Sequence, residues 1–333
     1  MNCTLELAQK MISASICLYE EKPWDLFDEH EVFEISKVEH GLTAYCLFHR
    51  LNGKKSITIF SGPEGFTNLS NMFKKTGLFR VDAFQYFERE SYEIIFDQPE
   101  QLEEDDIKLG EQMGYTPREL PLIRYCEKRC YADQPNNAEA ERLIKFLQGL
   151  SEGMKAYLDE GMNLDFHKNR FVYNVEKKSC FSKRTAYRPK KYDIVEIDNP
   201  ELMEEILELE EIEEVWEYDL QPTAAAIQRL EDQRTQPLYM AALADPVHQQ
   251  VLAGIPLQSD LDFQFQCIDL IIEAIMQRGI PKAVMVRHPL VGAAVMDLCK
   301  KLDIQLVPVE HFEVLDEFYD GLKEHLERKN ERC

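Results

Sequence analysis

The chain has 333 residues and carries 38 lysines and arginines against 61 aspartates and glutamates, a formal net charge of −23. This length indicates about two domains. The negative balance argues against broad nucleic-acid binding, which depends on cations at the phosphates, so nucleic acid is not an expected partner. With 44% hydrophobic residues the chain can bury a core. No apolar run approaches the roughly 18–20 residues of a membrane-spanning helix, and no membrane partner is expected.

The nine cysteines are scattered without a framework, and the first six residues contain no basic segment that leads into an apolar run. We therefore expect a reduced, cytoplasmic chain without a secretory signal. Cys126 and Cys130 form a C-x-x-x-C pair that could supply half of a metal site for zinc. A structural zinc ion needs four ligands, and no second close pair exists in the sequence. Two ordinary thiols are the default interpretation.

Residues 1–161 are predicted to form an α+β domain. A helix capped by Thr4 opens it, and its apolar residues recur at helical spacing. Asn52-Gly53 predicts a hairpin turn between two strands. The other expected elements are helices over Glu64–Lys75 and about Ala138–Asp159, and β-like stretches over Val32–Ile35, Leu42–Phe48, Ser56–Phe60, Ala83–Phe87 and Tyr92–Phe96.

Residues 162–235 are predicted to be a charged connector. Phe171–Val175 and Cys180–Tyr187 could form a basic hairpin, and the segment Glu196–Asp219 contains twelve acidic residues and no basic one. Pro200 opens an amphipathic helix in this acidic segment, with an inward stripe that is expected to comprise Leu202, Ile206, Leu209 and Ile212. Two interpretations stay open: the acidic helix packs its solvated face against the basic hairpin, or it is a docking surface for a basic protein partner.

Residues 236–333 are predicted to form an α/β domain, because two long crossovers between strands force parallel pairing. The expected strands are Leu238–Ala244, Gln250–Ile255, Ala283–Val286 and Ile304–Val309. The expected helices are Phe263–Arg278 (with Phe265 facing inward), Leu290–Leu302 and Phe312–Leu326.

Two resemblances follow from these segments. The order hairpin, helix, strand, helix, strand over residues 238–309 resembles the core of the ribonuclease H-like and transposase-integrase superfamily, with Leu238–Asp245 as its first strand and Gly279–Val286 as a later helix-to-strand turn. The whole chain is also similar to a group of bacterial two-domain proteins of unknown function, through Trp24–Phe27 and Ile57–Gly62. The first resemblance implies a fold and says little about activity.

An integrase-like enzyme would need two or three carboxylates that converge on divalent metal. Asp245 stands where the resemblance implies the first carboxylate, although an aspartate before Pro246 can equally serve the turn. Arg287 and His288 stand where the second is implied. Glu310 is a candidate for the third, with further acids at Glu313, Asp316 and Glu317.

His288 is also a candidate in its own right, because ligands favour the carboxyl ends of strands in α/β sheets. A plain loop histidine is the alternative. No G-x-G-x-x-G, G-x-S-x-G or H-E-x-x-H pattern occurs, and no cofactor is expected. We interpret the chain as a non-catalytic binding or interaction module. The alternative is a metal-dependent phosphodiesterase or nuclease-like enzyme that uses Asp245 with the downstream acids.

Overall fold

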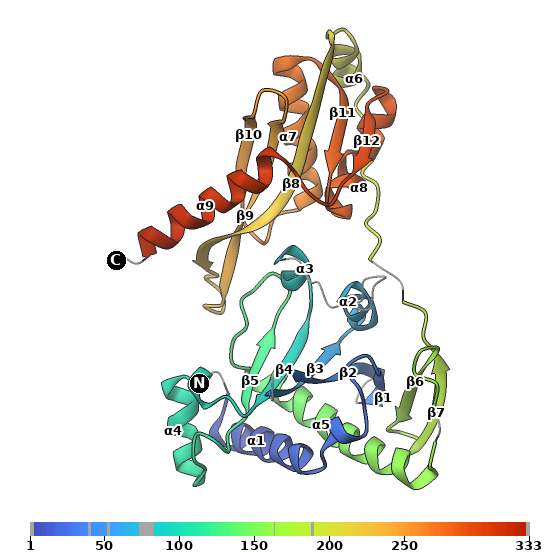
Figure 1. The fold of residues 1–333 in the computed structure, drawn as a ribbon, viewed down its shortest axis with the longest axis vertical. Coiled ribbons are helices and arrows are strands. Elements are labelled where there is room, and N and C mark those ends of the chain that lie inside the picture. The colour runs from blue at the N-terminus through green and yellow to red at the C-terminus, as the bar shows by residue number, and fades with distance from the viewer. Residues whose placement is uncertain are drawn as a thin grey trace. The chain divides into compact units, whose positions relative to one another are not determined.

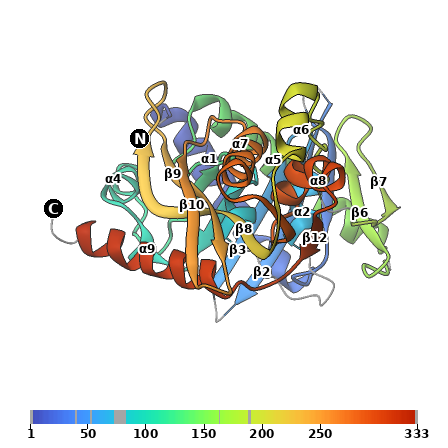
Figure 2. The same cartoon turned by 90° about the horizontal axis from the view of Figure 1, so that it is seen from above.

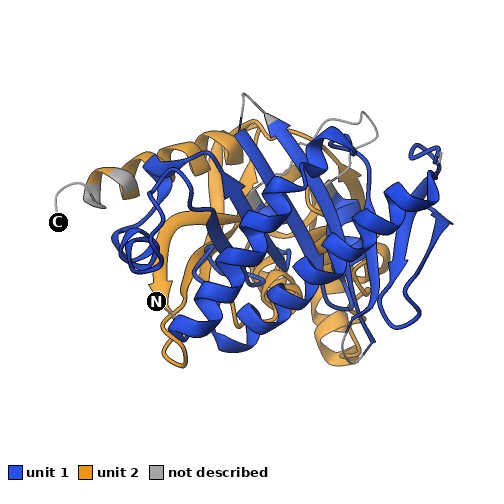
Figure 3. Cartoon of the chain, turned by 90° about the horizontal axis from the view of Figure 1, so that it is seen from below, with its two compact units in different colours: residues 1–190 blue, residues 191–333 orange. Residues whose placement is uncertain are grey.

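The computed structural model describes residues 3–38, 41–51, 54–72, 83–162, 164–187 and 190–330. The chain divides into two compact units, residues 1–190 and 191–333 (Figure 3). Within the described residues, none of the helices combines the length and the apolar character that crossing a membrane requires. Each unit is described by itself below.

A seven-stranded sheet forms the centre of the first unit, with the strand order β5-β4-β3-β2-β1-β6-β7 (Figure 1). Neighbouring strands pair antiparallel, except that β1 and β6 are parallel. The strands are β1 (Phe33–Val38), β2 (Leu42–Leu51), β3 (Lys54–Ser61), β4 (Ser91–Phe96), β5 (Leu122–Cys126), β6 (Asn169–Asn174) and β7 (Ser179–Arg184).

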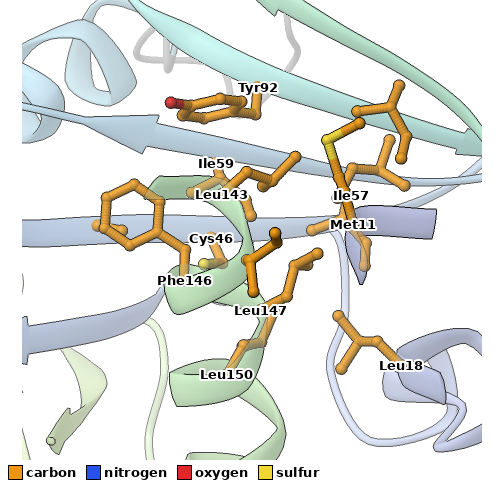
Figure 4. Close-up of a cluster of buried hydrophobic side chains, with 14 of the residues drawn as sticks. Met11, Leu18, Cys46, Ile57, Ile59, Tyr92, Leu143, Phe146, Leu147 and Leu150 are labelled. Carbon is orange, nitrogen blue, oxygen red and sulfur yellow. The ribbon is translucent and has the colours of Figure 1, made fainter. Parts of the chain in front are cut away.

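Two long helices, α1 (Leu5–Glu20) and α5 (Asn137–Glu160), cover one face of this sheet. Their apolar stripes meet the inward residues of the strands in one core; Figure 4 shows Leu143, Phe146, Leu147 and Leu150 of α5 against Cys46, Ile57, Ile59 and Tyr92 of the sheet. Helix α5 approaches the strands closely, because a Cβ on Gly153 would lie 2.8 Å from Phe33 Cζ. Gly161 ends the helix with φ +58°, a backbone conformation that glycine adopts at little cost.

The opposite face carries shorter helices and buried charge. It includes α2 (Gly65–Met72) and a small apolar cluster of Val32, Leu47, Phe60 and Leu69. Arg170 Nε donates to Glu34 Oε2 at 2.5 Å, and both side chains are almost completely buried. The remaining elements of the unit are α3 (Ala83–Phe87), α4 (Glu104–Met113) and the short 3-10 helices η1 (Pro23–Asp25) and η3 (Pro99–Gln101).

Three features of the first unit differ from the prediction or lie outside it. Residues Ala83–Phe87 form a helical turn, not a strand, because Phe84 and Phe87 are three residues apart and bury on the same side. Helix α4 and strand β5 were not predicted; Arg124 interrupts the apolar run of β5 and is buried in a pair with Asp106. The predicted turn Asn52-Gly53 lies outside the described residues.

The second unit is built on a five-stranded sheet with the order β10-β9-β8-β11-β12. The antiparallel strands β8, β9 and β10 are followed by two crossovers that place β11 and β12 parallel to β8. Helices α7 and α8 lie on one face and α9 on the other (Figure 2). The strands are β8 (Glu211–Gln228), β9 (Thr235–Asp245), β10 (Gln250–Leu257), β11 (Ile280–Val286) and β12 (Gln305–Pro308), and the helices are α6 (Pro200–Leu207), α7 (Phe263–Arg278), α8 (Pro289–Lys301) and α9 (Val314–Asn330).

After β8, this topology has the predicted hairpin, helix, strand, helix, strand order, and the mixed α+β and α/β class is confirmed. The strand that the sequence did not reveal is β8, the long central strand of the sheet. Helix α6 starts at Pro200 as predicted but ends at Leu207, so Leu209 and Ile212 lie outside it. Phe265 was expected to face inward, yet 56% of its surface is exposed.

The predicted domain boundaries also differ from those of the structure. The basic hairpin β6–β7 belongs to the first sheet through the parallel pairing of β6 with β1, and Lys183 and Lys190 contact Glu34 and Glu88 of that unit. Helix α6 and strand β8 belong to the second unit. Residues 162–235 are therefore divided between the two units, and the packing of the basic hairpin against the acidic segment stays a prediction.

Candidate functional site

The central strand β8 carries two completely buried carboxylates, Glu217 and Asp219. Side chains alternate along a strand, so these two residues share one face. Their partners across the ladder are Ala244 and Ala242 of β9, which pack in the apolar cluster that α9 covers. The buried acids therefore lie between the sheet and α9, beside the carboxyl end of β11.

Glu217 binds the start of α9. Its carboxylate accepts backbone N–H bonds from Glu313 at 2.7 Å, from Val314 at 3.0 Å and from Leu315 at 2.9 Å. The amides at a helix start have no partner within the helix and attract negative charge. Both carboxylate oxygens of Glu217 are occupied by these contacts, so the side chain holds the helix in place.

Asp219 pairs with Arg287, the first residue after β11. Arg287 Nη2 donates to Asp219, and its Nη1 donates to Asp316 Oδ1 at 2.6 Å. The guanidinium also lies 4.9 Å from the ring centroid of Phe312. Gln221 Nε2 donates to Asp219 Oδ2 at 3.2 Å, while Oδ1 has no hydrogen-bond partner among the residues that the structure describes. One arginine thus joins a carboxylate of the central strand to one of α9.

Burial and ion pairing shift the pKa values of Asp219 and Arg287 in opposite directions. Burial raises the pKa of Asp219 above its usual value, and the positive charge of Arg287 offsets only part of that effect. For Arg287, burial would lower the pKa, but Asp219 and Asp316 together raise it above its usual value. The arginine therefore stays charged and serves as the counter-ion of the buried carboxylate.

These contacts restrict what the carboxylates can do chemically. A divalent cation needs carboxylate oxygens that face a space open to the ion and its water. Glu217 is occupied by backbone amides, and Asp219 is bound by a guanidinium whose charge repels a metal ion at this distance. The arrangement is suited to holding α9 and β11 together.

Asp245 does not stand where the resemblance implied. It ends β9, the second strand of the sheet, and follows Ala244, so it points to the face opposite Asp219. Its Oδ1 accepts the N–H groups of Val247 at 2.8 Å and His248 at 3.2 Å, which is the turn-forming role of an aspartate. The assignment of Leu238–Asp245 as the first strand was wrong, because β8 precedes it in the sheet.

The remaining candidates do not lie in a common site. His288 is the N-cap of α8, and its Nδ1 accepts the N–H of Leu290 at 3.1 Å. Glu310 is exposed in the segment between β12 and α9. Cys126 and Cys130 are both buried, and burial raises the pKa of Cys126 to about 11, which keeps it a thiol at neutral pH. Among the described residues, neither cysteine lies in a cluster of three or more side chains spaced closely enough to share a metal ion.

Glu217 and Asp219 were not predicted as site residues, because they stand in the acidic segment interpreted as helix and connector. A signal for them was present. The run Val215, Trp216, Tyr218 and Leu220 is rich in strand formers, and the acids at 217 and 219 alternate with it.

Comparison with known proteins gives family matches to both units. Curated proteins contain no match to this chain. A chain in the crystal structure of the Mos1 strand transfer complex aligns at 10% identity with a TM-score of 0.22, over 71% of this chain and 62% of that one, so this chain spans less than two thirds of its length. Residues 9–174 match the family DUF7309 and residues 202–323 match the family DUF6930, each described as a domain of unknown function.

Proposed function

We propose that the chain is a binding module and that its second unit uses a ribonuclease H-like scaffold without phosphodiester chemistry. One observation carries the proposal: Asp219, the buried carboxylate of the central strand beside the end of β11, is paired with Arg287. Two-metal phosphoryl transfer places cations at this kind of position. A guanidinium in the same place supplies positive charge but neither activates water nor binds a phosphate oxygen as a metal ion does.

The charge of the chain supports the same conclusion. A net charge of −23 opposes the approach of a polyanion such as DNA or RNA. The alternative, a metal-dependent phosphodiesterase that uses Asp245 with the downstream acids, would need those acids on the same side of the sheet as Asp245. Asp316 lies on the α9 side, where it binds Arg287, whereas Asp245 points to the opposite face.

We expect no cleavage when the purified chain is incubated with single- or double-stranded DNA or RNA and Mg²⁺ or Mn²⁺. The assay uses labelled substrates and compares the wild-type chain with Asp219→Asn and Asp245→Asn. Circular dichroism of each variant establishes that it is folded. Cleavage that survives repeated purification and disappears in either folded variant would overturn the proposal and support the enzyme.

For the partner, we propose a basic protein segment that binds the acidic helix α6. The side chains of Glu201, Glu204, Glu205 and Glu208 are exposed on or beside this helix. Leu207 stands among them with 59% of its surface exposed. Carboxylates that surround an apolar side chain fit a lysine- and arginine-rich segment with an apolar residue at its centre, by charge complementarity.

The test measures the affinity of a lysine-rich peptide with one central leucine by fluorescence anisotropy. Neutralising Glu201, Glu204, Glu205 and Glu208 to glutamine is expected to weaken binding about tenfold, a loss of about 1.4 kcal/mol. A matched variant neutralises four exposed acids of the first unit, Glu100, Glu104, Asp105 and Glu111. Equal weakening by both variants would show attraction to net charge alone and would contradict a site on α6.

A further inference from the structure

A second group of ionisable side chains lies in the second unit, away from the Asp219–Arg287 pair. Glu214 stands near the start of β8, Asp245 ends β9, and His248 lies in the turn between β9 and β10. Each residue offers one ligand atom, and the three atoms lie within 4.8 Å of one another. Asp245 points to the sheet face opposite Asp219, so this group is separate from the buried pair.

The set of donors is chemically specific. It combines two carboxylates and one imidazole, which is a ligand set that Zn²⁺ accepts, with bonds of about 2.0–2.2 Å to oxygen and about 2.0–2.1 Å to nitrogen. Two such ligand atoms on one ion lie at most about 4.4 Å apart. The three ligand atoms lie within 4.8 Å of one another, which exceeds this maximum separation by well under 1 Å. Small side-chain movements therefore bring all three atoms to one ion.

The surrounding backbone and side chains position two of the three donors. Asp245 is completely buried and its Oδ1 is held by the amides of Val247 and His248, which leaves Oδ2 directed at His248 Nδ1, 2.5 Å away. Trp216 Nε1 donates to Glu214 Oε2 at 2.8 Å. Hydrogen bonds of this kind orient the side chains that bind a metal ion directly. The imidazole is 64% exposed, so an ion can enter and keep a water ligand.

One cation of the chain competes for the same place. Arg278 Nη2 contacts Glu214 Oε1 at 3.1 Å and Oε2 at 3.4 Å. Both side chains are partly exposed, and an exposed ion pair of this kind contributes little to stability. A divalent ion that binds Glu214 can therefore displace the arginine into solvent.

We propose that Glu214, Asp245 and His248 form a site for a divalent transition-metal ion of the zinc type, with water completing its coordination. The site lies on the opposite face of the sheet from Glu217 and Asp219. It requires no catalytic activity and is independent of the binding function proposed above.

The test titrates the full chain with ZnCl₂ by isothermal calorimetry. We expect one site that His248→Ala weakens at least tenfold. Arg278→Gln is expected to tighten binding, because it removes the competing cation. The matched control is His311→Ala, since His311 is also exposed and lies 3.9 Å from a carboxylate oxygen, that of Asp316; its affinity for Zn²⁺ should equal that of the wild type.

Titration with Co²⁺ separates this site from the cysteines. Bound Co²⁺ should show ligand-field absorption without a thiolate charge-transfer band, and His248→Ala should remove that absorption. Unchanged Zn²⁺ affinity in His248→Ala, or a thiolate band in the wild type that His248→Ala retains, would overturn the proposal. Nuclease activity has no bearing on either readout, so failure of this site and failure of the proposed function are distinguishable.

Discussion

Replacing Arg287 with methionine is expected to lower the free energy of unfolding of the second unit by about 3 kcal/mol. The change leaves Asp219 buried without its counter-ion, and removing one partner of a buried pair costs about 3–5 kcal/mol. The lower end applies because 23% of the arginine side chain is exposed. Denaturant unfolding is followed by fluorescence in a Trp24→Phe background, where Trp216 of β8 is the remaining tryptophan.

Two controls make the result specific to the pair. Arg328→Met removes an exposed pair with Glu324 on α9 and should change the stability by less than about 0.5 kcal/mol. The double variant Asp219→Asn/Arg287→Met removes both charges of the pair and should recover most of the free energy of unfolding that Arg287→Met loses. Equal destabilisation in the single and double variants would contradict an ion-pair role and indicate lost packing against Phe312.

The second unit shows which parts of a fold a sequence reveals. Helix α7 has both of its predicted ends, Phe263 and Arg278, because Asp262 caps it and Gly279 follows it. Strand β11 was found as a short apolar run before a helix. Strand β8 was missed because both of its faces are buried at residues 216–220. Glu217 and Asp219 lie on one of these buried faces, where the usual alternation predicts solvent-exposed polar residues.

The candidate site could be predicted only in part for the same reason. The sequence showed that Arg287 replaces an expected carboxylate, but not that the arginine pairs with Asp219, which is 68 residues away in the chain. The prediction of Asp245 as a turn residue agrees with its hydrogen bond to Val247. The prediction that it ends the first strand of the domain was wrong, because β8 comes before β9 in the chain and belongs to the same sheet. Contacts between distant residues depend on the strand order, which local patterns do not encode.

In the first unit, Arg170→Met is expected to lower the free energy of unfolding by about 3–5 kcal/mol. Arg170 and Glu34 are almost completely buried, at 6% and 5% side-chain exposure, and the guanidinium lies 4.5 Å from the ring centroid of Phe66. The substitution leaves a buried carboxylate beside the largely exposed Lys183, whose Nζ lies 3.6 Å from Glu34 Oε1. Unfolding is followed through Trp24 in a Trp216→Phe background.

The matched control, Lys168→Met, removes a pair with Asp165 that precedes the same strand but is largely exposed, and it should change the stability by less than about 1 kcal/mol. The comparison also tests the boundary between the units. Arg170 lies on β6, in the segment that the sequence placed in a connector, and a connector residue would not contribute to the core of the first sheet. Destabilisation by Arg170→Met no larger than that by Lys168→Met would therefore return β6 and β7 to the connector, whereas the expected loss makes them part of the first unit.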